Sequence, residues 1–256
     1  MHTIVLMYHG VTESGGGIGN PHCISLRSFE EQMTSLAQSK HTVIQWNEIV
    51  SSPTQCDVGS RVALTFDDAN TSDIHCAKVL GRLGYTALFF VPTNELGKPG
   101  RLGGAEVLEL SRQGMGIGSH AHHHVHLVRL SASELEQELR SSKAILEDLI
   151  QLPVEHLSFP GGAYDARVLD AARQSGYRYF HTSDWGVNTR RQLARGVLRR
   201  IPVVAGLGIA DFQGILGGNY RSRQIQFYAK EITKRALGEQ AYLQIRRAFL
   251  KRTSNR

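Results

Sequence analysis

The stretch LTFDDAN, residues 64–70, places two carboxylates side by side at the end of an apolar run. Residues 61–66 are typical of a buried strand, so Asp67 and Asp68 follow its carboxyl end. Adjacent acids repel each other, and two explanations are open at this point. Either the strand leads into a loop whose acids are solvated, or a cation lies there and the two acids have different roles.

Strands and helices alternate along the chain around this stretch. Short apolar runs predict further strands at residues 3–8, 85–92, 115–119, 155–159, 177–182 and 197–203. Amphipathic patterns predict helices at residues 25–40, 72–83, 104–114, 131–150 and 165–176, and Ser131 with Glu134 forms a capping box at the start of one of them. Continuous alternation of this kind predicts an α/β fold with a parallel sheet, either a barrel or a doubly wound sheet.

The composition is that of a globular protein. The chain has 256 residues, of which 41% are hydrophobic, and this length suits one α/β domain or two small ones. No run approaches the roughly 18–20 apolar residues that cross a bilayer. The first ten residues lack the pattern of a signal peptide, so a cytoplasmic location is expected. Three cysteines, Cys23, Cys56 and Cys76, cannot all pair and are expected to be reduced thiols.

The charge is unevenly distributed. The formal net charge is +6, yet residues 221–256 contain ten Lys or Arg and two Glu, a net +8, whereas the first 220 residues carry −2. Apolar residues in 230–252 recur at helical spacing, which favours an amphipathic helix that packs on the main domain with a solvated basic face. Peripheral contact of this tail with an anionic membrane, at the inner face, is a second interpretation. Docking onto an acidic polymer is a third. No nucleic-acid-binding motif accompanies the basic residues.

Five histidines lie within GSHAHHHVHL, residues 118–127, directly after the strand predicted at 115–119. His120 and His124 are four residues apart, which on a helical turn puts both imidazoles on one face. Two neutral imidazoles and one carboxylate are a common ligand set for a divalent metal with open positions. Parallel strands end on the same side, so Asp67 or Asp68 could supply the carboxylate. A solvated histidine loop is the alternative for this stretch alone.

Three segments together resemble the polysaccharide deacetylase family, also called the NodB-homology or carbohydrate esterase 4 family. They are TFDDA, SHAHHHVHL and SFPGGAYD, and the opening LMYHGV with the later LRRIPV resembles the branch that deacetylates poly-N-acetylglucosamine. The resemblance runs from about residue 3 to 204. It implies a distorted (β/α)7 barrel as the catalytic domain over residues 1–204, with residues 205–256 as a basic, mostly helical C-terminal extension.

The resemblance also implies roles for individual residues. Asp67 would be the general base, and Asp68, His120 and His124 the metal ligands. The backbone N–H of Gly161 would stabilise the oxyanion, and Pro160, Asp184 and Trp185 would line the substrate pocket, although Trp185 is equally well explained as a core aromatic residue. Zinc is the expected ion, and cobalt, nickel or iron also suit the ligands.

The sequence departs from the family pattern in two places. Ser158 stands where the family usually has the arginine that orients the base, and a late Leu-x-His motif that supplies the general acid is absent. We therefore expect His9, at the end of the first strand, to be the acid, because the first and last strands of a closed barrel are neighbours. A histidine packed at a strand end is the structural alternative.

The function that these expectations define is metal-dependent N-deacetylation of N-acetylhexosamine units in a surface polysaccharide or exopolysaccharide, or in a precursor of one. Two alternatives stay open. The first is an amidohydrolase that acts on a small non-sugar amide, because a fold does not fix a substrate. The second is a catalytically weak saccharide-binding protein, which the two departures would explain.

Overall fold

The computed structural model describes residues 2–15, 21–50, 60–219 and 224–225. Within these residues the strands are β1 (Thr3–Tyr8), β2 (Val11–Thr12), β3 (Ile24–Ser25), β4 (Thr42–Val43), β5 (Arg61–Asp67), β6 (Leu88–Val91), β7 (Gly116–Ser119), β8 (His156–Ser158), β9 (Tyr179–Trp185) and β10 (Val197–Pro202). The helices are α1 (Leu26–Ala37), α2 (Asp73–Arg82), α3 (Gly104–Arg112), α4 (Ala132–Ile150), α5 (Ala166–Gln174), α6 (Arg190–Ala194) and α7 (Ile209–Leu216).

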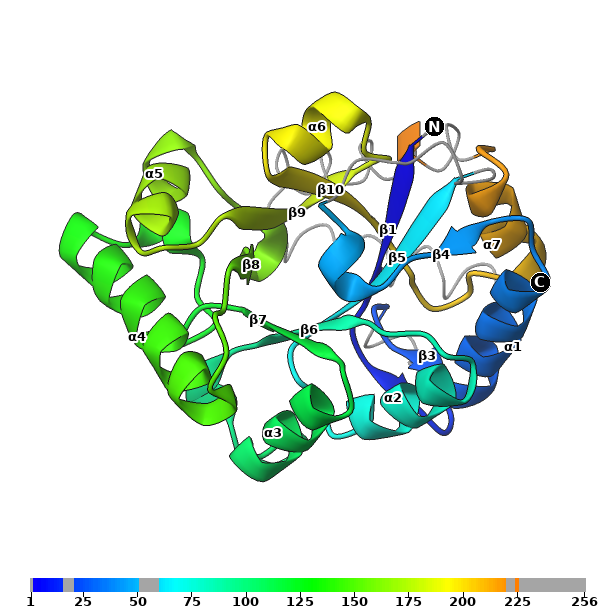
Figure 1. The fold of residues 1–256 in the computed structure, drawn as a ribbon, viewed down its shortest axis with the longest axis horizontal. Helices are drawn as coiled ribbons and strands as arrows, with labels where there is room; N and C mark the ends of the chain where they lie inside the picture. Colours follow the sequence, from blue (N-terminus) through cyan, green and yellow to red (C-terminus); the bar gives the residue numbers. More distant parts are fainter. Residues whose placement is uncertain (1, 16–20, 51–59, 220–223, 226–256) are drawn as a thin grey trace, which may run out of the picture. The chain divides into compact units, whose positions relative to one another are not determined.

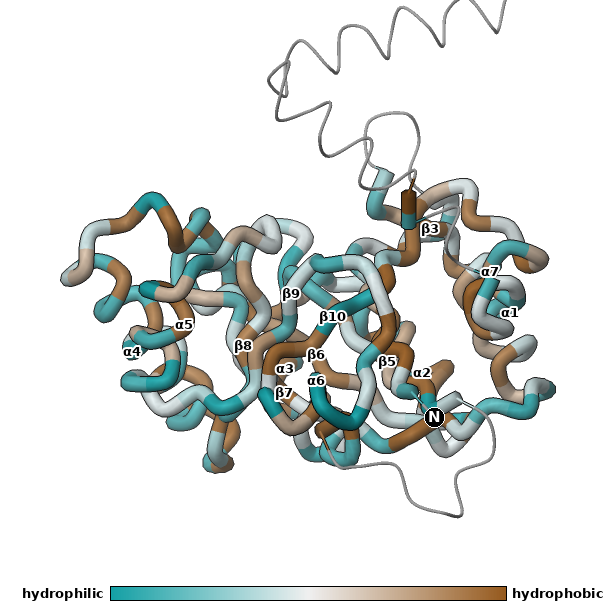
Figure 2. The backbone as a smooth tube through the Cα atoms, turned by 90° about the horizontal axis from the view of Figure 1, so that it is seen from above, coloured by the Kyte–Doolittle hydropathy of each residue, from teal (hydrophilic) through white to brown (hydrophobic). Residues whose placement is uncertain are grey.

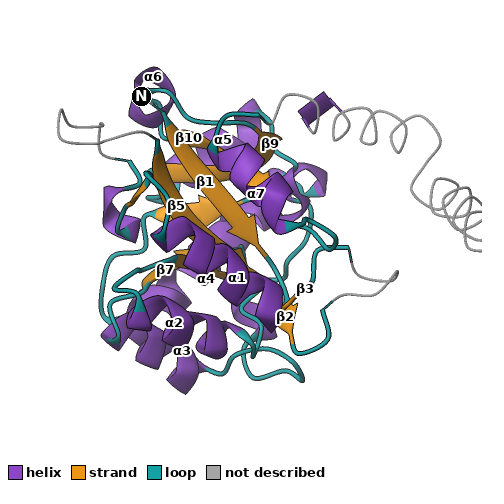
Figure 3. Ribbon diagram, turned by 90° about the vertical axis from the view of Figure 1, so that its right-hand side faces the viewer, coloured by secondary structure: helices purple, strands orange, loops and turns teal. Residues whose placement is uncertain are grey.

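Seven of these strands form a closed parallel barrel. They follow one another in the order β1-β10-β9-β8-β7-β6-β5, and β5 pairs back onto β1 along its length, from Thr3 opposite Arg61 to Tyr8 opposite Phe66. Each crossover carries a helix to the outside, so helices surround the strands (Figures 1 and 3). The predicted distorted (β/α)7 barrel is therefore confirmed, and the doubly wound alternative is wrong.

The two faces of each strand pack into different layers. Side chains of alternate residues point inward, where Val5, Ala63 and Phe90 belong to one buried cluster that Trp46 packs against. Gly118 of β7 makes room for this packing, because a Cβ there would lie 2.6 Å from the Phe90 ring. On the outer face, the ring of Phe66 stacks on that of Phe89 with centroids 4.7 Å apart. Figure 2 shows the apolar colouring of β5 and β6 at the centre.

The outer helices are amphipathic and capped as their sequences indicate. In α4 the Ser131 side chain accepts a hydrogen bond from the Glu134 backbone N–H, and the Glu134 carboxylate accepts one from the Ser131 N–H at 2.8 Å. This pair is the predicted capping box. Figure 2 shows polar and apolar colours alternating along this helix.

Most predicted elements lie within a few residues of the observed ones, and β9 differs most. The strand predicted at 177–182 runs from Tyr179 to Trp185, so Asp184 and Trp185 belong to the strand and do not follow it. The short strands β2, β3 and β4 and helix α6 were not predicted. Each is five residues long or shorter, which is too short to show a clear periodicity.

The region after the barrel begins with α7, which packs near α1 through a 3.0 Å hydrogen bond from Gln213 Nε2 to Ser35 Oγ. The contacts within the chain divide it into two compact units, residues 1–216 and residues 217–256. Most of the predicted basic extension, and the membrane contact through 221–256, lie outside the described residues. The boundary at residue 204 stays a prediction. Among the described residues no helix is long and apolar enough to span a membrane.

Candidate active site

The carboxyl ends of the parallel strands gather the predicted site residues at one end of the barrel. Asp67 is the last residue of β5, His120 follows β7, His9 follows β1, and Gly161 lies three residues after the end of β8. These residues are far apart in sequence, and the closure of the barrel is what brings them together.

Asp67 is buried inside the barrel and held by an arginine of β10. Arg200, whose exposed fraction is 0%, donates from Nη1 to Asp67 Oδ1 at 2.7 Å and from Nη2 to Asp67 Oδ2 at 2.8 Å. Ser158 Oγ donates to Asp67 Oδ2 at 3.1 Å and accepts from Arg200 Nη2 at 2.8 Å. Burial by itself would raise the pKa of Asp67, but the Arg200 guanidinium and His120 hold it well below its usual range. Asp67 is therefore a fixed carboxylate at neutral pH.

Arg200 was not among the residues that the sequence pointed to. The family pattern has its orienting arginine at the position of Ser158. Here the guanidinium comes instead from β10 in LRRIPV, where Arg199 is exposed and Arg200 is buried. The alternation of exposed and buried residues along β10 could have indicated Arg200. Residues two apart in a strand share a face, and Leu198 belongs to the buried core cluster.

Asp68 points its carboxylate toward the two predicted histidine ligands. Its Oδ1 lies 3.1 Å from His124 Nε2 and 3.6 Å from His120 Nε2, and ligand atoms of the three residues lie within 4.8 Å of one another. Two ligands that each lie about 2.0–2.2 Å from a zinc ion are separated by roughly 3–4 Å. The residues therefore fit a divalent ion, as their donor chemistry suggests.

The tautomer of His120 also suits a metal ligand. Its Nδ1 lies 2.8 Å from the carbonyl oxygen of Ser158. A carbonyl only accepts, so Nδ1 must carry the proton. The lone pair then lies on Nε2, the nitrogen that is 3.6 Å from Asp68 Oδ1. Burial lowers the pKa of His120 and favours the neutral ring. By contrast, the hydrogen bond with Asp68 raises the pKa of the exposed His124, so a cation at this site competes with a proton.

The other histidines of the 118–127 stretch lie around the predicted ligands. The His123 side chain and backbone N–H both bind the Glu138 carboxylate of α4, with Nδ1 2.8 Å from Oε2. His122 Nδ1 lies 2.7 Å from Thr93 Oγ1. Neither residue belongs to the cluster of Asp68, His120 and His124.

His9 lies near the carboxylates but makes no hydrogen bond to them. Among the described residues its buried Nδ1 has no hydrogen-bond partner, and its ring lies 5.0 Å from that of the exposed His22. Burial lowers the pKa of His9, and the charges of Asp67 and Asp68 oppose that shift. The structure thus brings His9 to the site, while its predicted role as acid stays a prediction.

Gly161 sits in a tight turn beside an exposed histidine. Its φ is +64°, and a Cβ there would lie 2.2 Å from Cε1 of His126, so only glycine fits against that ring. Pro160 is buried at the start of the same turn, Pro160–Gly162. The predicted use of the Gly161 N–H remains untested by these contacts.

Asp184 and Trp185 are the last two residues of β9, where the register with β10 shifts. Asp184 is half-buried and accepts a 2.8 Å hydrogen bond from Tyr164 Oη, a residue that the sequence analysis did not single out. Trp185 has an exposed fraction of 3% and lies opposite Arg200 on the neighbouring strand. Burial of this kind agrees with a core aromatic residue as well as with a pocket wall.

Known proteins resemble this chain in sequence and in fold. The family model described as polysaccharide deacetylase matches residues 54–180. A Bacillus subtilis (strain 168) protein, YxkH, whose description assigns it provisionally to the polysaccharide deacetylases, is 27% identical over 211 residues, which cover 81% of this chain and 74% of YxkH. The chain belongs to the polysaccharide deacetylase family.

Two solved structures share the fold. The Streptococcus pyogenes deacetylase PplD, in complex with acetate, has a TM-score of 0.75 and 19% identity over 84% of this chain and 98% of PplD. IcaB from Ammonifex degensii has a TM-score of 0.73 and 20% identity over 84% of this chain and 96% of IcaB. At these identities the likeness concerns the barrel itself.

Proposed function

We propose that this protein is a metal-dependent N-deacetylase that hydrolyses the acetamide of N-acetylhexosamine units in a surface polysaccharide or exopolysaccharide, or in its precursor. The observation that carries the proposal is the convergence of Asp68, His120 and His124 beside a separate carboxylate, Asp67, that Arg200 binds with two hydrogen bonds. One carboxylate is thereby available as a ligand, while the other is fixed as a base.

Asp68, His120 and His124 would hold the ion, with zinc as the expected metal. When bound, such an ion supplies Lewis acidity, which lowers the pKa of a water molecule and polarises a carbonyl oxygen. This assignment also explains the adjacent acids of LTFDDAN, because a cation at Asp68 offsets its repulsion with Asp67.

Asp67 would accept the proton of the attacking water as general base. Its contacts with Arg200 and Ser158 fix the direction of its carboxylate, and they keep it ionised before the reaction. The N–H of Gly161 would donate to the developing oxyanion. Pro160, Asp184 and Trp185 would bound the pocket for the acetyl group.

His9 would donate a proton to the leaving amine. Burial lowers the pKa of His9, and the charges of Asp67 and Asp68 partly offset that shift. We expect His9→Gln to lower kcat on the order of 10²–10⁴-fold, with unchanged zinc affinity. His75→Gln, at an exposed position on α2, is the control. Full activity of His9→Gln would remove this role and leave the metal site standing.

Acetate release tests the function. We expect the protein to release acetate from chitooligosaccharides, to lose that activity with a strong chelator, and to regain it with added zinc. Activity on small non-sugar amides alone would support the amidohydrolase alternative. Saccharide binding without acetate release would support a binding protein, and it would overturn the proposal.

A further inference from the structure

The turn that follows β5 has a backbone that L-residues rarely adopt. Asp68 and Ala69 have φ values of 81° and 50°. Ala121 and His124 in the histidine stretch also have positive φ, so four of the five such non-glycine residues in the described chain lie in the two segments that carry the predicted ligands. Conformations of this kind persist only where neighbouring structure holds them.

The segment that braces this turn comes from the loop after β6. The backbone N–H of Leu102 donates to Ala69 O at 2.8 Å, and that of Thr71 donates to Gly100 O at 3.1 Å. Leu102 itself is buried with an exposed fraction of 0%, which anchors the loop to the core. These contacts use the backbone alone and would survive most substitutions.

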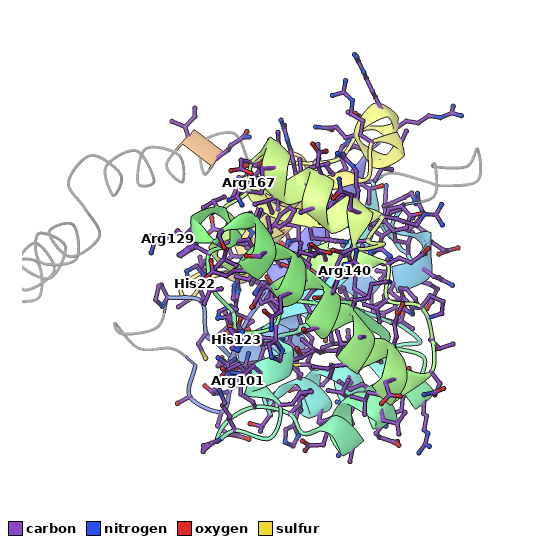
Figure 4. The ribbon with its side chains drawn as sticks, turned by 90° about the vertical axis from the view of Figure 1, so that its left-hand side faces the viewer. His22, Arg101, His123, Arg129, Arg140 and Arg167 are labelled. Atoms are coloured by element: carbon purple, nitrogen blue, oxygen red, sulfur yellow. The ribbon has the colours of Figure 1, made fainter. Side chains whose placement is uncertain are left out.

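Arg101 adds a side-chain contact between this loop and the Asp68 backbone. Its Nη1 donates to the carbonyl oxygen of Asp68 at 2.9 Å and to Asn70 Oδ1 at 2.9 Å. One guanidinium nitrogen therefore binds both the first and the last residue of the turn Asp68–Asn70. Figure 4 shows Arg101 on the same face of the molecule as His123 of the histidine stretch.

The charge of Arg101 works against a cation site. Its Nη1 lies 3.9 Å from Asp68 Oδ2, the carboxylate that would bind the metal. On Coulombic grounds alone, removal of this positive charge should strengthen the binding of a divalent cation. A geometric role predicts the opposite result, because the Asp68 carboxylate would lose its direction when the turn relaxes.

We propose that Arg101 is a positioning residue, which holds the Asp68–Asn70 turn in its left-handed conformation and so directs the Asp68 carboxylate toward His120 and His124. This inference rests on the proposed metal site, and it names a determinant of that site outside the ligands. The geometric effect outweighs the unfavourable charge of the guanidinium.

The test is the zinc dissociation constant of the chelator-treated full chain, measured by competition with a chromophoric chelator at pH 7.5. Arg101→Met should weaken zinc binding by about 10-fold or more, in the range seen when groups that orient ligands are removed. Arg101→Lys, which keeps a donor nitrogen, should fall between Met and wild type. Unfolding in EDTA, followed by circular dichroism, reports separately on general stability.

Lys98→Met is the matched control. Lys98 lies in the same loop and carries the same charge, but its side chain pairs with Glu95 at 2.8 Å and not with the turn. We expect its zinc affinity to equal or slightly exceed that of wild type. Wild-type or tighter binding by Arg101→Met would overturn the inference.

Two further outcomes are also decisive. If Arg101→Met does not fold, Asn70→Ala removes one acceptor of the guanidinium while Arg101 keeps its charge. A several-fold loss of zinc affinity then supports the inference, and an unchanged affinity overturns it. If the wild-type chain itself binds no zinc, the proposed metal site fails together with this inference, a result distinct from a failure confined to Arg101.

Discussion

At the scale of single residues, the side chain on which Asp67 depends is Arg200. Both are buried, and the guanidinium donates to both carboxylate oxygens while Ser158 bridges the two residues. A buried ion pair of this kind contributes little to stability relative to apolar residues, but loss of one partner leaves the other charge buried and uncompensated. The pair therefore serves the geometry and ionisation of Asp67.

Substitution of Arg200 should separate stability from catalysis. Arg200→Met should lower the free energy of unfolding by roughly 3–5 kcal/mol, because the Asp67 carboxylate stays buried without its partner. Arg200→Lys keeps a positive charge and loses the paired donors, so we expect kcat to fall about 100-fold through displacement of the base, with little change in KM. Urea denaturation and acetate-release kinetics measure the two effects.

The matched control for these variants is Arg199→Lys, at the exposed neighbouring position of β10. It should leave stability and kinetics unchanged. If Arg200→Lys retained the wild-type kcat, the two-donor contact with Asp67 would have no part in the reaction.

At the scale of elements, strands β8 and β9 bring together two buried histidines, His156 and His181. His156 Nδ1 lies 3.0 Å from His181 Nε2, and the His181 ring lies 4.7 Å from that of Phe90. Burial lowers the pKa of His156 to about 4 and that of His181 well below its ordinary value. Both rings are therefore neutral in the folded protein at physiological pH.

This pair should make stability depend on pH. Below pH 6.5, the ordinary pKa of histidine, the two side chains take up protons in the unfolded chain but not in the folded chain. The free energy of unfolding should therefore fall as the pH is lowered from 6.5 toward 4. His156→Asn, which retains a polar group near the position of Nδ1, should show a shallower fall in urea denaturation with EDTA present. The exposed His75→Asn should keep the wild-type dependence, and an equal dependence in all three proteins would contradict the assignment.

The sequence predicted elements better than it predicted contacts. The strands that end at Asp67 and at Ser119 were predictable from their apolar runs, and with them the meeting of Asp68, His120 and His124. Arg200 was missed because its partner lies 133 residues away and LRRIPV places two arginines together.

Asp184 and Trp185 were placed after a strand, whereas β9 continues through both. The left-handed φ of Asp68 and Ala69 was also not evident, since neither residue is glycine.

At the scale of the whole molecule, barrel closure makes the site. The pairing of β1 with both β5 and β10 brings His9, Asp67 and Arg200 to one end, although they lie up to 191 residues apart in the sequence. No single segment holds a complete site, so we expect folding of the barrel to precede binding of an ion by the residues that follow β5 and β7. The central claim is that one ion is shared by side chains from these two strand ends.

The most direct measurement of that claim is the number of tightly bound zinc ions per chain after dialysis, determined by elemental analysis. We predict one ion in the wild type and in His122→Gln, His123→Gln and His126→Gln, and none in Asp68→Asn, His120→Gln or His124→Gln, with folding checked by circular dichroism. Retention of zinc by folded Asp68→Asn, His120→Gln and His124→Gln, or its loss from the other three histidine variants alone, would contradict the account.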